Sequence, residues 1–293
     1  MSSLSRLIER GAATLEGAKA LDRAIVPVQK LTRRLPPGRL KDLLSGVPVG
    51  HPVHPAIVAV PLGAFAGVSY LDLAGGDRVA ARRLLLLGVA TSLPAVVTGL
   101  SDWSDTEGSE RRVGAMHAAT NAAALGLYVS SWLARGSAAG GGRKRSLAAL
   151  TVLSVGGWLG GHLAYALGVG VDTTAFLEPM VEWTDACALA ELAGDTLVGT
   201  TLGETPVVLT LVDGEPRAMF GRCTHRGAPL AEGRLIDGCL ECPWHGSRFA
   251  LTDGAVERGP ATRPQPSFEV RVREGQVQVR RGESSALRLN PAR

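Results

Sequence analysis

Four apolar segments in the first half of the chain constrain its fold more than any other feature. They cover about residues 53–74, 84–103, 113–134 and 147–170. Each has roughly 20 residues, enough for a helix to cross a hydrocarbon core about 30 Å thick. Full charges are almost absent from them, and Asp72 lies near the end of the first. A buried soluble bundle is the alternative. Because four such runs in succession are rare in soluble cores, we predict a four-helix transmembrane domain over residues 48–172.

Proline and glycine inside these segments are compatible with membrane helices. Pro61 and Pro94 are tolerated there when neighbouring helices satisfy the freed carbonyl groups. The fourth segment carries four glycines at close spacing: Gly156, Gly157, Gly160 and Gly161. A small-residue face of this kind lets two helices approach closely in a bilayer.

The first 47 residues form a basic amphipathic segment. Apolar residues recur at helical spacing from Leu4 to Leu31, and lysine and arginine lie among them. Two interpretations are open: a helix on an anionic membrane surface, or a solvated helix packed on the rest of the protein. The net charge of +4 arises largely here. No nucleic-acid motif accompanies it, so a nucleic-acid partner is not expected.

The chain changes character after about Asp172. Short alternating segments are split by glycine, aspartate and proline, as in a small antiparallel β domain. Clear examples are Val207–Val212, Phe268–Val272 and Val277–Arg281. We therefore predict an α+β multidomain protein, in which an all-β domain over residues 173–282 follows the four-helix transmembrane bundle. Residues 283–293 are predicted to be a flexible tail.

Two short pairs of cysteine and histidine stand out in the β region. Cys223-Thr-His225 is followed, after sixteen residues, by Cys242-Pro-Trp-His245. Two thiolates and two imidazoles can hold a 2Fe–2S centre in which histidines replace two cysteines on one iron. They can also hold tetrahedral zinc. Zinc sites usually place roughly two to four residues between the first two ligands, whereas a single residue stands here, so the spacing favours an iron–sulfur centre.

The stretch around these pairs resembles the Rieske family. The resemblance covers about residues 180–282 and includes Gly227 after the first pair and Gly246-Ser247-Arg248-Phe249 after the second. It implies one 2Fe–2S cluster, with Cys223 and Cys242 on the buried iron and His225 and His245 on the outer one. It also implies four residues close around the cluster: Gly227, Pro243, Trp244 and Ser247.

Within that family the chain is more similar to the ferredoxin-type domains that serve ring-hydroxylating dioxygenases. High-potential members carry a disulfide-forming cysteine in each loop, where this chain has Ala228 and Trp244. Ser247 resembles the serine that in high-potential members donates a hydrogen bond to a cluster sulfur, whereas Phe249 replaces their tyrosine. Hydrogen bonds to sulfur raise the potential. The resemblance therefore implies a low potential that Ser247 raises.

The remaining four histidines all fall in the predicted membrane part: His51, His54, His117 and His162. Ionisable side chains inside membrane spans are rare and usually functional. Antiparallel helices would place all four on one side of the bilayer, the side on which the chain leaves the fourth helix. Three hypotheses are open: ligation of haem b, a metal or quinone site, or imidazoles that only bond to neighbours such as Asn121 or Tyr165.

Residues 48–170 also resemble an uncharacterised bacterial membrane-domain family that is sometimes fused to Rieske domains. The resemblance rests on the start of the first segment, Gly50-His51-Pro52 followed by His54-Pro55. That family has no settled function, so it implies a membrane location and nothing about chemistry.

These features predict a membrane-anchored Rieske protein that carries single electrons, as a carrier or as a subunit of an oxidoreductase. Its partners would be the lipid bilayer, a reductase and an electron acceptor, and the sequence identifies neither redox partner. The alternative is a membrane-bound redox sensor whose cluster state regulates the helical domain. A terminal oxygenase is not expected. About 48 residues follow His245 without another histidine, whereas the mononuclear iron site needs two histidines and a carboxylate.

We expect a multi-pass protein of the cell membrane with its Rieske domain in the cytoplasm. Lysine and arginine are about equally frequent at both ends of the predicted helices, so the positive-inside rule does not choose a side. The cytoplasmic side is favoured because no secretory signal peptide is recognisable and no cysteines are placed for a disulfide. Cys187 and Cys239 are expected to be core or turn residues.

Overall fold

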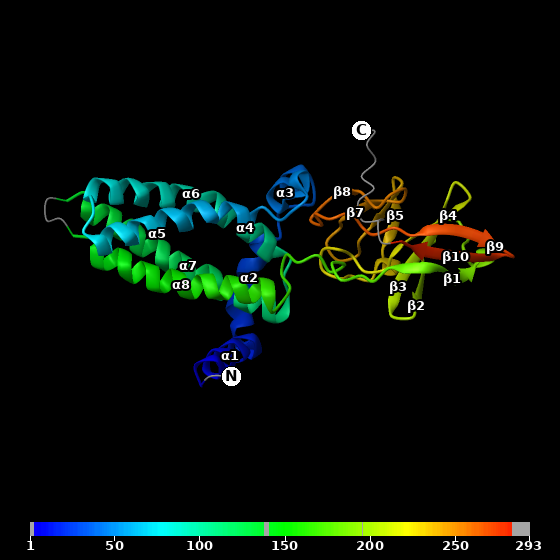
Figure 1. Ribbon diagram of the computed structural model, residues 1–293, viewed down its shortest axis with the longest axis horizontal. Coiled ribbons are helices and arrows are strands. Elements are labelled where there is room, and N and C mark those ends of the chain that lie inside the picture. The colour runs from blue at the N-terminus through cyan, green and yellow to red at the C-terminus, as the bar shows by residue number, and fades with distance from the viewer. Residues whose placement is uncertain (1–2, 138–140, 195, 283–293) are drawn as a thin grey trace. The chain divides into compact units, whose positions relative to one another are not determined.

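The protein is described by a computed structural model that covers residues 3–137, 141–194 and 196–282 (Figure 1). The chain forms two compact units. The first combines Met1–Leu35 with Val53–Val169, and the second combines Pro36–Pro52 with Gly170–Arg293. Long helices make up most of the first unit, and strands make up most of the second. The predicted tail over residues 283–293 lies outside the described residues.

Four long helical segments lie side by side in the first unit (Figure 1). They are α4 (His54–Ile57) continued by α5 (Ala59–Ala74), then α6 (Arg78–Ser104), α7 (Gly108–Arg135) and α8 (Arg143–Tyr165). The turn between α5 and α6 shows how one helix ends and the next begins. Gly75 has a φ of 71°, a conformation that glycine adopts without strain. The Asp77 side chain then accepts the Val79 N–H at 2.7 Å as an N-terminal cap.

Among the described residues, three helices are long and apolar enough to cross a membrane: His54–Ala74, Arg78–Ser104 and Arg143–Tyr165. The prediction of four spanning helices is therefore met by three, and a four-helix transmembrane bundle is not established. α7 is long enough, but His117, Asn121, Thr120 and its serines lower its hydropathy. Large apolar side chains are exposed on each of the three candidates, as contact with lipid requires; examples are Leu73, Leu93 and Val155.

An aromatic stack lies at the centre of the helical unit. The rings of Phe65 and Tyr128 have centroids 3.8 Å apart and planes that differ by 1°. Val68, Leu85 and Ala149 are fully buried around them. Each helix thus contributes to one small core, and the alanine allows a neighbouring helix to come close.

A buried ion pair lies in the same unit. Nη2 of Arg135 donates to both carboxylate oxygens of Asp72, at 2.7 and 2.6 Å. Ser146 Oγ donates to the same carboxylate. The two charged side chains are each 4% exposed. Such a pair is stable only when its hydrogen bonds are satisfied, which fixes α5, α7 and α8 at this level.

The expected N-terminal segment over residues 1–47 is divided between the two units. Its first part, α1 (Ser3–Gly17), η1 (Lys19–Leu21) and α2 (Asp22–Thr32), packs on α6 and α7. Arg112 Nη1 donates to Asp22 Oδ2 at 3.0 Å. Gln29 Nε2 donates to the carbonyl oxygens of Trp103 and Thr106, both at 2.9 Å. This part of the segment therefore packs on the helical unit.

The second unit contains three antiparallel sheets, with strand orders β1-β10-β9, β2-β3-β4 and β5-β6-β7-β8. The strands are β1 (Met180–Ala188), β2 (Val198–Leu202), β3 (Thr205–Val212), β4 (Glu215–Phe220), β5 (Arg234–Ile236), β6 (Cys239–Glu241), β7 (Arg248–Ala250), β8 (Val256–Arg258), β9 (Glu269–Arg273) and β10 (Gln276–Arg281). Two short helices, η3 (Leu189–Glu191) and η4 (Leu230–Glu232), connect them. One core gathers around Leu209 and Val277, and a second around Leu240 and Phe249. The second core also contains Cys223 and Cys242.

Residues 36–52 belong to this β unit and form α3 (Arg39–Ser45) and η2 (Val47–Val49). Asp42 Oδ1 accepts the Gly259 N–H at 2.8 Å. Val47 packs so closely that a Cβ on Gly259 would lie 2.6 Å from its side chain. Pro37 lies 3.9 Å from the Cβ position of Gly246. This segment therefore rests on the β unit, beside the loop that carries Cys242.

Candidate metal centre

Two loops with the same backbone pattern carry the two cysteine–histidine pairs. The Gly227 N–H donates to the Cys223 carbonyl at 2.8 Å, and the Gly246 N–H donates to the Cys242 carbonyl at 3.1 Å. The two glycines have φ values of 71° and 72°. A side chain is strained in that left-handed region, so glycine lets each loop turn back sharply over its cysteine.

The two cysteine thiols are buried and lie against each other. Cys223 is 1% exposed and Cys242 is 3% exposed. The hydrogen bond between them raises the pKa of Cys223 well above its usual value and lowers that of Cys242 to about 7. Backbone N–H groups within each loop donate to the sulfurs: His225 and Arg226 to Cys223, and Trp244 and His245 to Cys242. Donors of this kind favour thiolates, the form that binds metal.

The two imidazoles lie together on the outer side of the thiols. The rings of His225 and His245 have centroids 5.1 Å apart and planes at 84°. Both side chains are half-buried, and their Nδ1 atoms are buried. Pro243 and Trp244 are exposed next to them. Each imidazole thus has one nitrogen in the interior and another edge near the surface, as an outer ligand needs.

The arrangement of the four side chains distinguishes two metal ions from one. A structural zinc ion needs four ligands around a single point. Among the described residues, no three His, Cys, Asp or Glu side chains converge on one such point. The thiols form one pair and the imidazoles another, which fits two irons that take two protein ligands each. The donor set therefore fits a binuclear cluster.

Ser247 is bonded to Cys242 through its backbone and has a buried hydroxyl. It is fully buried in the second loop, and its carbonyl accepts the Cys242 N–H at 2.8 Å. Its hydroxyl oxygen accepts the Ala261 N–H at 2.9 Å. Because the backbone donor occupies the oxygen as an acceptor, the hydroxyl proton is left to be donated to another group.

Gln265 supports the first loop and could not be found from the sequence. It is 1% exposed. Its Oε1 accepts the Thr224 N–H at 3.1 Å, and its Nε2 donates to the carbonyls of Phe220 and Arg222 at 2.7 Å each. These bonds surround Cys223 on both sides along the chain. A lone glutamine about 40 residues away carries no local pattern that would reveal this role.

Charged residues bond to the second loop, which carries Cys242 and His245. Arg258 donates to the Gly246 carbonyl through Nε at 3.0 Å and through Nη2 at 2.7 Å. Glu241 accepts from Arg258, Arg248 and Arg234. Burial opposes its ionisation, but the hydrogen bonds from Arg248 and Arg234 outweigh it, so the pKa of Glu241 lies below its usual value. The Glu241 carboxylate thus fixes the Arg258 side chain, which in turn bonds the second loop at Gly246.

We expect Glu241→Gln to make the β unit less stable at neutral pH by about 1–3 kcal/mol, because three arginines lose their charged partner. A carboxylate with a lowered folded-state pKa stabilises above its unfolded pKa, and this contribution disappears as pH falls through the folded pKa. The difference between variant and wild type should therefore be largest at pH 6–7 and shrink below about pH 4.5. Thermal unfolding across pH measures it. Glu269→Gln, in an exposed pair with Arg280, is the matched control and should change little. A difference that stays constant down to about pH 3 would contradict the assignment.

The other predicted site histidines contact different partners. His51 is exposed and belongs to the β unit. His54 Nδ1 lies 2.9 Å from the Ala95 carbonyl oxygen, and His117 Nδ1 lies 2.8 Å from that of Gly156. His162 Nε2 lies 2.9 Å from Glu16 Oε1 on α1. All three helical histidines are half-buried at the end of the unit where α6 passes into α7.

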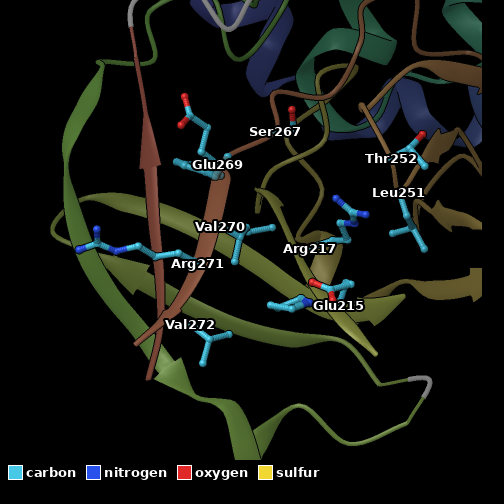
Figure 2. Close-up of a pocket in the computed structure, with 12 residues that line it drawn as sticks. Glu215, Arg217, Leu251, Thr252, Ser267, Glu269, Val270, Arg271 and Val272 are labelled. Atoms are coloured by element: carbon cyan, nitrogen blue, oxygen red, sulfur yellow. The ribbon is translucent and has the colours of Figure 1, made fainter. Parts of the chain in front are cut away.

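The β unit also has a hollow of about 220 Å³, shown in Figure 2. Residues of β4, β9 and the turn after β7 line it, among them Glu215, Arg217, Leu251 and Glu269. None of the four cluster side chains lines it. It is therefore separate from the metal centre.

Two buried thiols and two half-buried imidazoles on paired loops define an iron–sulfur protein with mixed cysteine and histidine ligation. The model of the Rieske [2Fe-2S] domain matches residues 182–269, and that of a predicted membrane protein family, DUF2231, matches residues 50–173. The chain belongs to the Rieske [2Fe-2S] family, fused to this membrane-protein domain. The family implies one 2Fe–2S cluster, as predicted.

Two relatives are small ferredoxins. The anthranilate 1,2-dioxygenase ferredoxin subunit of Burkholderia cepacia is 33% identical over 103 residues, which are 35% of this chain and 95% of that protein. Ferredoxin CarAc of Metapseudomonas resinovorans is 35% identical over 98 residues, 33% of this chain and 92% of that protein. A solved complex of oxygenase and ferredoxin in carbazole 1,9a-dioxygenase matches 33% of this chain and 92% of that chain, with 34% identity and a TM-score of 0.32.

Proposed function

We propose that the protein is a membrane-anchored carrier of single electrons, or the electron-transfer subunit of an oxidoreductase. The observation that carries this proposal is the paired arrangement of Cys223 and Cys242 inside and His225 and His245 outside. Half-buried imidazoles give electrons a short route to a docked partner. The ferredoxin relatives support a role in transfer rather than in substrate chemistry.

The helical unit would anchor the cluster in the cell membrane, with four crossings. α4 together with α5, α6 and α8 have the length and hydropathy for this. We include α7 because it packs extensively on α8 and buries Tyr128 in the shared core. Its polar residues would then face neighbouring helices rather than lipid. A cytoplasmic cluster domain would receive electrons from a reductase there and pass them to an acceptor.

The test is redox titration of the full-length protein in detergent, followed by electron paramagnetic resonance and absorbance. We expect the signal of a reduced Rieske centre, reversible one-electron behaviour, and re-reduction by a ferredoxin reductase at catalytic rates. A protein that binds zinc in place of iron, or a cluster that no reductase reduces, would contradict the proposal.

A redox sensor is the second candidate, and one contact favours it. Residues 36–52 connect α2 to α4 along the chain, and Pro37 and Asp42 contact the β unit at Gly246 and Gly259. A change of the loop around Cys242 on reduction would reach this connection first. Slow electron exchange, together with reduction-dependent protease cleavage within residues 36–52, would favour sensing over carriage.

We expect Ser247→Ala to lower the reduction potential by on the order of 50 mV. A hydroxyl that donates to a cluster sulfur stabilises the more negative reduced state. A hydrogen bond to a charged group contributes about 1.5–3 kcal/mol, part of which the oxidised state shares, and roughly 59 mV corresponds to 1.4 kcal/mol for one electron. Protein-film voltammetry measures the shift. Thr210→Val removes another buried hydroxyl of the β unit, which bonds the Thr196 carbonyl, and should leave the potential unchanged. An unchanged potential in Ser247→Ala would show that the hydroxyl points elsewhere.

Electrons would continue into the helical unit if its histidines hold a redox group, and haem, a metal ion and a quinone are the classes to distinguish.

A further inference from the structure

The helical unit is built from two copies of one hairpin, α4–α6 and α7–α8. Residues of the first helix correspond to residues of the third at a constant separation of 63, the separation of Asp72 from Arg135. At this spacing His54 meets His117, Leu62 meets Leu125, Gly63 meets Gly126 and Phe65 meets Tyr128. Few residue types are shared, so the repeat is faint in the sequence.

The buried positions show the repeat clearly. On α5 and α7 these corresponding pairs are buried in both copies: Pro61 and Ala124, Phe65 and Tyr128, Val68 and Ser131, Asp72 and Arg135. On α6 and α8 the separation is 61, and the same holds for Leu85 and Ser146, Gly88 and Ala149, Ala95 and Gly156, Thr98 and Leu159. Both hairpins therefore turn corresponding faces inward.

Two of these pairs touch each other directly. Phe65 stacks on Tyr128, and Asp72 bonds to Arg135. Corresponding residues of two copies can meet only close to the axis that relates the copies. An approximate two-fold axis therefore runs between the hairpins, through the aromatic stack and the ion pair.

The two histidines sit in the same cradle in each copy. His54 places Nδ1 on the Ala95 carbonyl and its ring against Gly99, where a Cβ would lie 2.8 Å from the imidazole. His117 places Nδ1 on the Gly156 carbonyl and its ring against Gly160, where a Cβ would lie 3.0 Å away. The carbonyl and the glycine are one helical turn apart in both. A cradle preserved while most other residue types differ points to a role for the imidazoles.

The cradle fixes the proton on each ring. A carbonyl oxygen only accepts, so Nδ1 carries the hydrogen and Nε2 presents a lone pair. This is the state of a histidine that ligates a metal, with its other nitrogen held by a carbonyl. A lone pair cannot donate to a quinone oxygen. Asn121 Nδ2 donates to the backbone carbonyl of His117 at 2.9 Å and lies 3.3 and 3.2 Å from Nδ1 and Nε2 of the same ring. The rings of His54 and His117 are also close enough to interact electrostatically.

The other two histidines lack this arrangement. The Glu16 carboxylate accepts from His162 Nε2, so that nitrogen carries a proton and not a free lone pair. His51 is exposed and belongs to the other unit. Corresponding positions give no partner for either, since Gly114 matches His51 and Ser101 matches His162 in the repeat.

We propose that His54 and His117 are the two axial ligands of a haem iron bound across the two-fold axis. A free metal ion needs three or four protein ligands, and two imidazoles supply only two. Haem iron has four nitrogens from its own macrocycle and needs two more ligands, which two symmetric imidazoles supply. The proposal rests on the proposed electron-transfer function, in which the ferric haem takes one electron from the reduced cluster.

The test uses the full-length protein from cells supplied with haem precursor. Wild type should contain about one haem per chain with a low-spin spectrum, and near-infrared magnetic circular dichroism should identify two imidazole ligands. His54→Ala and His117→Ala should each lose haem to below about a tenth of wild type or turn it high-spin. His51→Ala and His162→Ala are the controls and should retain it. The Rieske signal should stay the same in all five proteins.

Haem-free wild type with a complete cluster would overturn the haem site and leave the proposed function standing. Loss of the cluster signal itself would instead count against that function. A low-spin haem that survives His117→Ala, or one lost equally in His162→Ala, would also overturn the assignment. If the alanine variants do not fold, the dichroism of wild type decides alone, because a histidine–methionine or single-histidine signature excludes the pair.

Discussion

Replacing Cys242 by serine is expected to abolish the 2Fe–2S cluster, while replacing Cys239 by serine leaves it intact. Both cysteines are buried and belong to the same short stretch of β6 and the loop after it. Only Cys242 has its sulfur against Cys223 and receives backbone N–H donors from the loop. A serine hydroxyl does not ionise near neutral pH and is a poor ligand for iron in such a cluster.

The measurement is the ratio of iron to protein together with the spectrum of the reduced cluster. Cys242→Ser should fall below about a tenth of the wild-type cluster content, because each iron has only two protein ligands to lose. Cys239→Ser controls for loss of a buried sulfur, since its thiol only approaches the Asp237 carbonyl, at 3.7 Å. Equal cluster content in the two variants would refute the assignment of Cys242 as a ligand.

The spacing of the motif predicted that these four side chains meet in two pairs, but not which residues hold their two loops. Each cysteine and histidine is local to a loop, so a short pattern reports it. Gln265 and Arg258 act through hydrogen bonds to carbonyls far away in sequence, at Arg222 and at Gly246. Contacts of that kind depend on the tertiary fold and leave no local signature.

The apolar segments located the helices but misplaced their ends, for physical reasons. α6 begins at Arg78, before the predicted start near residue 84, because an arginine-containing turn continues a helix that Asp77 caps. α8 ends at Tyr165, before the predicted end near residue 170. Gly168 and Gly170 have φ values of 67° and 78°, which an α-helix cannot contain. Hydropathy identifies the apolar part of a helix. Its first and last residues are determined by capping residues and by glycines with positive φ.

The internal repeat escaped the sequence analysis because the copies conserve burial rather than residue type. Asp72 and Arg135 correspond, yet they carry opposite charges. Val68 corresponds to Ser131, and Leu85 to Ser146. A comparison of residue types does not detect such pairs. The contacts of Phe65 with Tyr128 and of Asp72 with Arg135 do show them.

Asp72→Ala is expected to destabilise the helical unit by about 3–5 kcal/mol, because it leaves the Arg135 guanidinium buried without its carboxylate. Ser146 would lose the same acceptor. For a unit of this size, a shift of roughly 10 °C in the thermal midpoint should follow. Circular dichroism of the protein in detergent measures it, while the Rieske signal reports that the β unit stays folded.

The exchange variant, Asp72→Arg combined with Arg135→Asp, is the matched control. Rotation by 180° about the approximate two-fold axis interchanges positions 72 and 135. The exchanged residues should therefore form the same ion pair in the opposite orientation. Recovery should be partial, since Ser146 supports the carboxylate on one side and its counterpart, Leu85, cannot do so. The exchange variant should therefore unfold above Asp72→Ala and below wild type. An exchange variant no more stable than Asp72→Ala would show that the two positions are not equivalent, and would remove the axis on which the pairing of His54 with His117 depends.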